Sequence, residues 1–160
     1  MGVAARSREA VEERLAGLQE TYGTVPVNQT TFTLPAARYE AVTDQYSGGL
    51  VDAYVAVSNR DDEVLHVAAD EGLELPGTAT GDDESLERGA CRAVEEATGV
   101  VCSIDGLDEV TIAGIRNGDD PESDTVYRLV VVFSAEYVDG AVETDAEWAD
   151  RLQEVAPVYV

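Results

Sequence analysis

The segment from Leu75 to Val100 constrains the fold most, because three structural signals follow one another in it without interruption. A short apolar strand pattern stops at Pro76-Gly77, and a loop rich in glycine and aspartate extends over residues 77–83. Residues 85–98 then carry apolar side chains at helical spacing, and Gly99 follows as a typical helix terminator. The sequence therefore predicts a strand, a loop and an amphipathic helix in direct succession.

Strand patterns lie on both sides of this segment. They are rich in β-branched and aromatic residues, and turn residues such as those at 59–62 separate them. The predicted strands span residues 50–58, 64–69, 73–75, 100–104, 110–116 and 126–137. The order of helices and strands predicts an α+β or α/β sandwich without an internal repeat.

The first 48 residues have a different pattern from the rest of the chain. Residues 7–22 form an amphipathic helical pattern, with Ser7 as candidate N-cap and Gly23 as its stop. Residues 24–34 are predicted to be extended, and Pro35 opens a second short helix that ends before Gly48-Gly49. About 45 residues are too few for a separate core. We therefore predict that residues 1–48 pack as an extension on a main domain of residues 49–160.

The C-terminal region contains a helix signal of its own. Thr144-Asp145-Ala146-Glu147 has the form of a capping box, in which the first and last side chains satisfy backbone N–H groups of the first turn. This sequence predicts a last helix that contains Trp148 and Leu152.

The charge of the chain excludes some classes of function. There are 33 acidic residues and 10 basic ones, all arginine, and the net charge is -23. Binding of nucleic acid through a basic patch is excluded by this balance. A disordered acidic chain is disfavoured by apolar runs such as residues 127–133, and a nucleic-acid mimic would concentrate its charge on one face. The acids are spread along the chain, and the composition resembles that of proteins from salt-loving archaea.

The sequence also bears on the protein's location. There is no apolar run of 18 residues and no apolar signal segment near the N-terminus, so we expect no membrane association and a cytoplasmic location. Cys91 and Cys102 lack the histidine neighbours of a zinc pattern, and we predict that both are buried free thiols.

Residues 75–100 resemble the Nudix box, whose pattern is Gly, five residues, Glu, seven residues, then Arg-Glu-apolar-any-Glu-Glu-any-Gly-apolar. Aligned without gaps, the segment matches this pattern at Glu84, Arg92, Val94, Glu96, Gly99 and Val100. The resemblance covers about residues 50–155. It implies an α+β fold, an α/β/α sandwich with a mixed sheet and a central loop-helix element, and a metal-dependent hydrolysis of a nucleoside diphosphate linked to another group.

Three positions depart from the pattern: Thr78 replaces the first glycine, and Ala93 and Ala97 replace two glutamates. In the family, these glutamates and the one aligned to Glu96 hold a divalent metal against the diphosphate and help to activate water. The spacing places all three on one helix face. We predict that the two alanines widen an apolar stripe whose other members are Leu86, Ala90 and Val94.

The resemblance supplies the candidate site. Glu84, Arg92 and Glu96 are the catalytic candidates, Gly77 and Thr78 the ligand-binding ones, and Glu96 the metal ligand. Mg²⁺ or Mn²⁺ binding is expected to be weakened. Two structural alternatives stay open: Glu96 with Arg92 as a modest surface pair, and Glu84 with Arg92 as a salt bridge that fixes the loop on the helix.

Other polar residues have structural interpretations that we prefer to catalytic ones. His66, the only histidine, alternates within a strand and is predicted to be a core or edge residue rather than a general base. The acidic run that follows residue 118 is predicted to face solvent rather than a pocket; its members are Asp119, Asp120, Glu122 and Asp124.

Three functions remain open. The first is a divergent protein that binds a small nucleotide-like ligand with weakened or lost hydrolysis, and the second is an active hydrolase that uses carboxylates from outside the box. The third is a structural or assembly module that reuses the fold. Loss of two carboxylates favours the first and third. A homodimer remains open as well.

Overall fold

The computed structural model describes residues 3–45, 51–69, 72–80, 85–143 and 146–150. The elements in chain order are α1 (Val3–Tyr22), β1 (Val27–Leu34), α2 (Ala36–Gln45), β2 (Val51–Ser58), β3 (Val64–Ala69), β4 (Gly72–Glu74), β5 (Gly77–Thr80), α3 (Leu86–Thr98), β6 (Val101–Asn117), β7 (Val126–Asp139) and β8 (Ala146–Ala149). The helix predicted from residue 85 to 98 and the central strands are thus confirmed.

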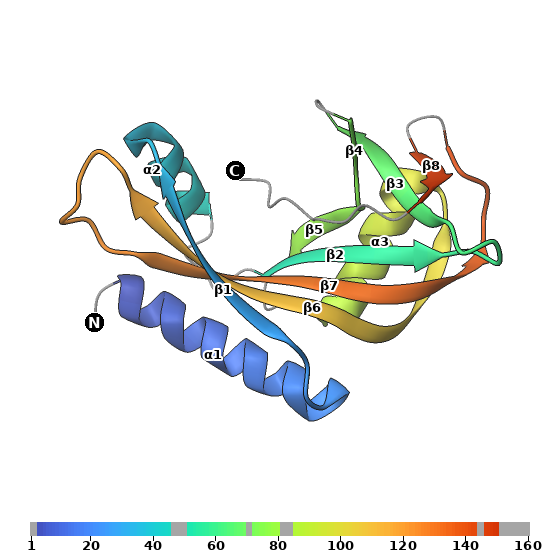
Figure 1. Ribbon diagram of the computed structural model, residues 1–160, viewed down its shortest axis with the longest axis horizontal. Helices are drawn as coiled ribbons and strands as arrows, with labels where there is room; N and C mark the ends of the chain where they lie inside the picture. Colours follow the sequence, from blue (N-terminus) through green and yellow to red (C-terminus); the bar gives the residue numbers. More distant parts are fainter. Residues whose placement is uncertain (1–2, 46–50, 70–71, 81–84, 144–145, 151–160) are drawn as a thin grey trace.

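The strands form one mixed sheet in the order β1-β6-β7-β2-β3-β4, with β5 on β2 and β8 on β3. The pairs β1–β6 and β2–β7 are parallel, whereas β6–β7 is antiparallel. Strand β2 meets β3 at a single register pair, Ser58 with Val64, so that β3, β4 and β8 diverge from the rest of the sheet (Figure 1).

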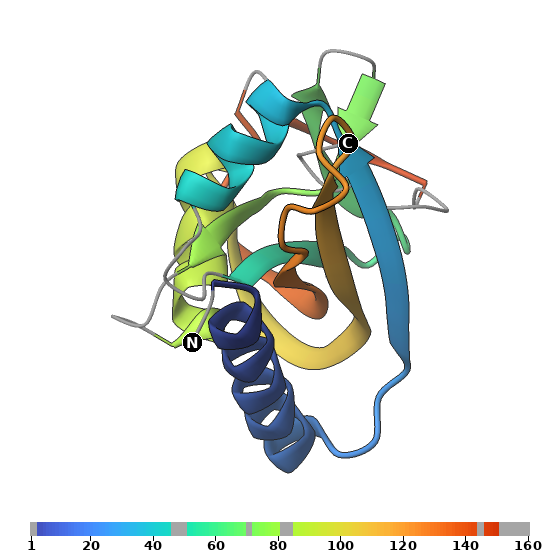
Figure 2. The ribbon, with the colours of Figure 1, turned by 90° about the vertical axis from the view of Figure 1, so that its left-hand side faces the viewer.

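Alternation along β2 divides the core into two clusters. Val51, Val55 and their odd-numbered neighbours contribute to the cluster that includes residues of α1 and α3. Tyr54 and Ala56 contribute to a cluster on the opposite face, against which Tyr39 of α2 packs. Figures 1 and 2 show α1 and α2 on opposite sides of the long ribbon formed by β6 and β7. Successive residues of a strand face opposite ways, so each face of the sheet presents its own apolar side chains. Helices pack on both faces, and the arrangement is a sheet between helices.

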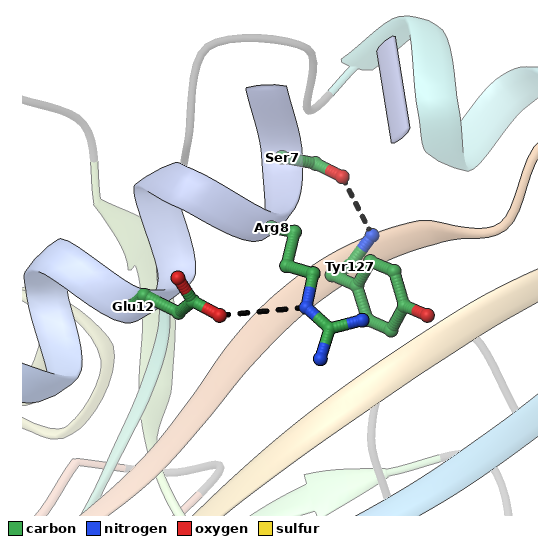
Figure 3. A network of polar contacts seen from close by, with 4 residues as sticks. All are labelled: Ser7, Arg8, Glu12 and Tyr127. Carbon is green, nitrogen blue, oxygen red and sulfur yellow. Dashed lines mark hydrogen bonds and ion pairs between the residues drawn. The ribbon is translucent and has the colours of Figure 1, made fainter. Parts of the chain in front are cut away.

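Helix α1 is anchored to β7 near its start (Figure 3). The backbone N–H of Tyr127 donates to Ser7 Oγ at 2.9 Å, and the Arg8 guanidinium lies 5.5 Å from the centre of the Tyr127 ring. The prediction of Ser7 as N-cap is wrong, since the helix already begins at Val3 and the Ser7 hydroxyl is used for this tertiary contact. The predicted stop is confirmed, because Gly23 has a φ of 78° and its N–H donates to Gln19 O.

The other end of α1 contacts α3. The Tyr22 hydroxyl donates to Glu87 Oε1 at 2.8 Å, and the Tyr22 ring packs against Phe133 with the ring centres 6.0 Å apart. Burial, together with the Glu87 carboxylate, raises the pKa of Tyr22. Glu87 lies in the first turn of α3, so α1 covers the sheet and also touches the helix of the box-like segment.

Strand β6 is one long strand where the sequence predicted two. The separate predictions for residues 100–104 and 110–116 missed the link between them, because Asp105 and Gly106 interrupt the apolar pattern. The structure accommodates the link through register shifts relative to β7 between Ile104 and Gly106 and between Leu107 and Glu109. Such bulges keep a strand paired while they re-aim its side chains.

The predicted C-terminal helix is wrong in the described part. Residues 146–149 form β8, which pairs antiparallel with β3, and Leu65 lies opposite Trp148. The Trp148 ring also meets Tyr137 edge-on, with the ring centres 5.9 Å apart. Pairing with an open strand edge and burial of the aromatic ring therefore outweigh the local capping signal. Thr144, Asp145 and Leu152 lie outside the described residues.

The acidic loop between β6 and β7 is exposed, as predicted, and one of its members also supports α2. Asp119 Oδ2 accepts a hydrogen bond from the backbone N–H of Ala36 at 2.8 Å. Ala36 is the first residue of α2, where backbone N–H groups lack helical partners. Pro35 precedes it, as the sequence predicted, whereas the predicted end of this helix at Gly48-Gly49 lies outside the described residues.

Candidate functional site

Helix α3 is defined at both ends by local interactions. Ser85 is extended, and its side chain accepts a hydrogen bond from Arg88 N at 3.2 Å. At the other end, Gly99 adopts the left-handed conformation with φ 78°, and its N–H donates to Glu95 O at 2.8 Å. A side chain at Gly99 would meet the backbone of Ala141 and the side chain of Glu143, so the position requires glycine. The glycine predicted to end the helix has this role.

The buried face of α3 consists of small and apolar residues: Leu86, Gly89, Ala90, Val94 and Thr98. These residues bring the helix against β2, β5 and β6. The prediction that both alanines widen this stripe is wrong for Ala97, which is exposed, while Ala93 is half-buried. The buried face of α3 is narrower than the helical spacing of its apolar residues suggested, so both alanines lie beside it. Longer side chains at these two positions would reach solvent.

Arg92 and Glu96 are brought together on the outer face of α3. Arg92 Nε lies 3.9 Å from Glu96 Oε1, and the two side chains are 56% and 73% exposed. Arg92 and Glu96 thus form the modest surface pair that was one of the two structural alternatives. The predicted roles of these residues toward a ligand or a metal stay predictions.

Strand β5 begins within the predicted loop and corrects that part of the interpretation. Residues 77–80 pair antiparallel with β2, with Gly77 opposite Tyr54 and Thr78 opposite Ala53. The approach is close: a Cβ on Gly77 would collide with the Ala53 carbonyl oxygen and lie 2.8 Å from the Tyr54 ring. Packing therefore accounts for glycine at position 77. Of Thr78, the structure describes the backbone alone, and Glu84 with its predicted salt bridge lies outside the described residues.

A buried ion pair lies next to β5, and the sequence analysis missed it. Arg128 Nε and Nη2 donate to the two oxygens of Asp52 at 3.0 and 2.7 Å, and the side chains are 1% and 5% exposed. Asp52 is opposite Ala79 of β5 and Val130 of β7. Burial raises the pKa of Asp52, although the Arg128 guanidinium opposes this shift. The sequence signal for this pair was a single charged residue within the apolar part of each strand, Asp52 in β2 and Arg128 in β7.

The residues of α3 do not fit a divalent-metal site of the kind that the resemblance implies. Mg²⁺ is usually held by carboxylates together with substrate oxygens and water. At the three box positions, α3 offers the Glu96 carboxylate alone, since Ala93 and Ala97 have no donor atoms. Over the residues that the structure describes, no group of three or more His, Cys, Asp or Glu side chains is arranged to hold a metal.

A hollow of about 820 Å³ lies at the other end of β2, around the β2–β3 turn and the end of β7. Arg60 lines it, but so do acidic residues, among them Asp61, Asp62, Asp105 and Glu136. Ser134 Oγ donates to Asp105 at 2.7 Å. This excess of negative charge disfavours an anionic ligand. Because β5 pairs with the opposite half of β2, the hollow is also remote from the segment that leads into α3.

The remaining polar candidates are structural. His66 is 0% exposed within β3, as its strand pattern predicted, and neither ring nitrogen has a hydrogen-bond partner among the described residues. Cys91 and Cys102 are both free thiols. Cys102 is buried as predicted, whereas Cys91 is half-buried.

Comparison with known proteins gives a likeness of fold. No family model matches the chain, and no curated protein matches it. Among solved structures, a UDP-X diphosphatase is similar with a TM-score of 0.50 and 16% identity, over 91% of this chain and 62% of that protein. The chain therefore spans less than two thirds of that relative.

Two further solved structures have lower TM-scores. The MutT protein from Methanosarcina mazei Go1 has a TM-score of 0.47 and 22% identity, over 63% of this chain and 76% of that one. A NUDIX hydrolase from Nitrosomonas europaea has a TM-score of 0.46 and 19% identity, over 63% and 57% of the two chains. The mixed sheet between helices confirms the predicted α+β sandwich, and the UDP-X diphosphatase shares this fold. None of the helices in the described ranges has the length and apolarity of a membrane span.

Proposed function

We propose that the chain binds a small nucleotide-like ligand with a diphosphate group, and that its hydrolysis of this ligand is weakened or lost. One observation carries this proposal: α3, the helix of the segment that resembles the Nudix box, is capped at both ends and packed on the sheet, yet it offers Glu96 without carboxylates at positions 93 and 97. A helix maintained in this way, with alanine at the catalytic positions, favours binding over chemistry.

The charges on α3 support recognition of an anion. Arg92 is more than half exposed, and its Nε lies 3.9 Å from the Glu96 carboxylate. An arginine can form paired hydrogen bonds with phosphate oxygens. The first turn of α3 adds backbone N–H groups without partners inside the helix, of which that of Arg88 donates to Ser85 Oγ, and such a turn favours negative charge. The UDP-X diphosphatase similar in fold acts, by its name, on a diphosphate.

Hydrolysis is limited by the same residues. A divalent metal, when bound, would neutralise the diphosphate and acidify the attacking water. The alanines at positions 93 and 97 contribute nothing to holding it. The alternative of an active hydrolase relies on acids outside the box positions, such as Asp82 and Asp83 in the sequence just before α3.

Binding can be tested by calorimetric titration with ADP-ribose and a UDP-sugar. Arg92→Ala is expected to weaken binding about tenfold or more, since a hydrogen bond to a charged group contributes about 1.5–3 kcal/mol. Arg60→Ala is the matched control, because Arg60 is also exposed, carries the same charge and lies at the hollow remote from the segment that leads into α3. It should change the affinity by less than about threefold. If the unaltered chain binds neither ligand, the proposal is wrong and a structural or assembly module is favoured instead.

Activity provides a second test on the same ligands with Mg²⁺ or Mn²⁺. We expect turnover far below ~1 s⁻¹, a value at the low end for enzymes. The double substitution Ala93→Glu with Ala97→Glu should raise turnover by about 10²–10³ if the lost electrostatic stabilisation is the limit. Turnover of the unaltered chain above ~1 s⁻¹ that Glu96→Gln abolishes would establish the active alternative.

The acidic composition supports a cytoplasm of high salt as the working environment. At about 1 M salt, charges are screened beyond about 3 Å, so that a net charge of -23 no longer opposes folding strongly. The activity assay is therefore best run in about 2–3 M KCl, whereas the titrations that compare charge variants need about 0.1 M KCl, where the Debye length is about 10 Å.

A further inference from the structure

Two thiols from different elements meet beside the core. Cys91 lies on α3 and Cys102 on β6, and their Sγ atoms are 3.9 Å apart. Both are free. A disulfide requires an S–S distance of about 2.05 Å, so rotation of the two side chains must close a gap of roughly 2 Å. The pair is therefore within reach of a covalent bond without a change of fold.

The connection between α3 and β6 holds the two thiols in place. The Thr98 hydroxyl donates to Val94 O at 2.6 Å and accepts from Val100 N at 3.2 Å. Glu143 N also donates to Thr98 O at 2.9 Å, which ties this connection to the chain after β7. Because the helix end and the strand start are fixed in this way, the distance between the sulfurs is set by the fold and not by a flexible loop.

The two thiols differ in access. Cys91 is half-buried, whereas Cys102 is 8% exposed. Burial, with a smaller contribution from Cys91, raises the pKa of Cys102 to about 12. Because Cys91 is the more accessible thiol, it is the residue that meets an oxidant, and Cys102 is placed to resolve the product.

We propose that Cys91 and Cys102 form a reversible dithiol–disulfide pair that clamps the middle of α3 to β6, with hydroperoxides as the oxidant. The inference does not depend on the proposed ligand. It assigns a modification site to two residues that the resemblance leaves without a role.

The chemistry balances in two steps. The Cys91 thiolate attacks one oxygen of hydrogen peroxide, the O–O bond breaks, and the released hydroxide takes a proton to leave as water. Cys91 is then a sulfenic acid. The Cys102 sulfur attacks the Cys91 sulfur, the S–O bond breaks, and hydroxide leaves as water with the Cys102 proton. Two thiols lose two electrons and two protons, and peroxide is reduced to two waters. Attack by an external dithiol on the more accessible Cys91 reverses the bond.

Peptide mapping can locate the bond directly. Trypsin cleaves this lysine-free chain after arginine, and Arg92 separates the two cysteines. Digestion without reductant should join the fragment of residues 89–92 to that of residues 93–116 after mild peroxide treatment. Reduction should separate them again and add about 2 Da to the intact chain, the mass of two hydrogens. Cys91→Ala and Cys102→Ala should each abolish the link.

A thermal melt tests the clamp. Closing a ring of about twelve residues should raise the midpoint of the oxidised chain by about 5–10 °C over the reduced chain. Peroxide should not shift the melt of Cys91→Ala, which replaces a half-buried side chain and is expected to fold. The proposal is overturned if Cys91 is instead oxidised to sulfinic acid, if disulfides form between chains, or if the linked chain melts at the same temperature as the reduced one.

Discussion

Two arginine–carboxylate pairs contrast the sheet with the helix that packs on it. Arg128 and Asp52 form two hydrogen bonds of 3.0 and 2.7 Å inside the sheet and are almost inaccessible. Arg92 and Glu96 approach to 3.9 Å on the outer face of α3, and more than half of each side chain is exposed. The first pair joins strands β2 and β7, whereas the second joins neighbouring turns of one helix.

The difference is between charges that are buried in the fold and charges that are exposed to solvent. A buried ion pair has lost its hydration and depends on the partner, so removing one member leaves an uncompensated charge. An exposed pair gains little, because water and salt compete with the contact. Of the two arginines, Arg92 is the one exposed to solvent. We expect mutations to divide in the same way, with stability effects at the sheet and binding effects on α3.

The largest expected effect is on the buried pair. Asp52→Ala should lower the free energy of unfolding by about 3–5 kcal/mol, because Arg128 keeps its charge in an apolar setting. The double substitution Asp52→Val with Arg128→Met should recover most of this loss, since an apolar pair of similar volume avoids the cost of burying charge. Urea unfolding can be followed through Trp148, the single tryptophan.

The recovery is what distinguishes this interpretation from a general intolerance of the site. A double variant as unstable as Asp52→Ala would mean that the pair is required for its shape or hydrogen bonds and not for charge balance. In that case the contrast between the two pairs would no longer be one of desolvation.

The sequence predicted the parts of the fold that local patterns determine. The helix at residues 86–98 follows from its apolar spacing, Ser85 and Gly99, and the central strands follow from their β-branched runs. It failed where distant contacts decide. Trp148 lies in a strand because β3 has an open edge, and Ser7 bonds to a residue 120 positions away. The buried pair was missed because Asp52 and Arg128 are 76 residues apart and adjacent only through the parallel pairing of β2 with β7.

The candidate site was predicted in part. The box-like spacing correctly placed Arg92 and Glu96 together on one side of α3. It did not predict that Ala97 would be exposed, because the width of a helix's buried face depends on what packs against it, here β2, β5 and β6. Nor did it predict a packing reason for Gly77, which arises from the close approach of β5 to β2.

An effect of intermediate size is expected when the salt concentration is raised, and the buried pair should not share in it. Raising KCl from 0.1 to 3 M is expected to increase the melting temperature by several degrees, because the Debye length falls from about 10 Å to below about 3 Å and self-repulsion of the -23 charge declines. The coupling energy of Asp52 with Arg128 should persist in 3 M KCl, since water and ions do not reach it. A melting temperature that is flat or falls with salt would contradict the high-salt interpretation of the composition.

The smallest stability effect is expected at the exposed pair, where the effect on binding should be the more informative one. Glu96→Gln should change the free energy of unfolding by less than about 0.5 kcal/mol, and a loss above about 1 kcal/mol would show that the pair is structural after all.

Without divalent metal, the same substitution removes a negative charge 3.9 Å from Arg92, so a diphosphate ligand should bind about two- to fivefold more tightly. With Mg²⁺ or Mn²⁺ the sign depends on what Glu96 does. If Glu96 contributes to holding the metal, Glu96→Gln should weaken the metal-assisted binding, and the two titrations will shift in opposite directions. If both shift toward tighter binding, Glu96 acts only as the partner of Arg92, and the helix recognises its ligand through the arginine. Glu95→Gln is the matched control, because Glu95 is the adjacent exposed carboxylate on α3 and should leave both affinities nearly unchanged.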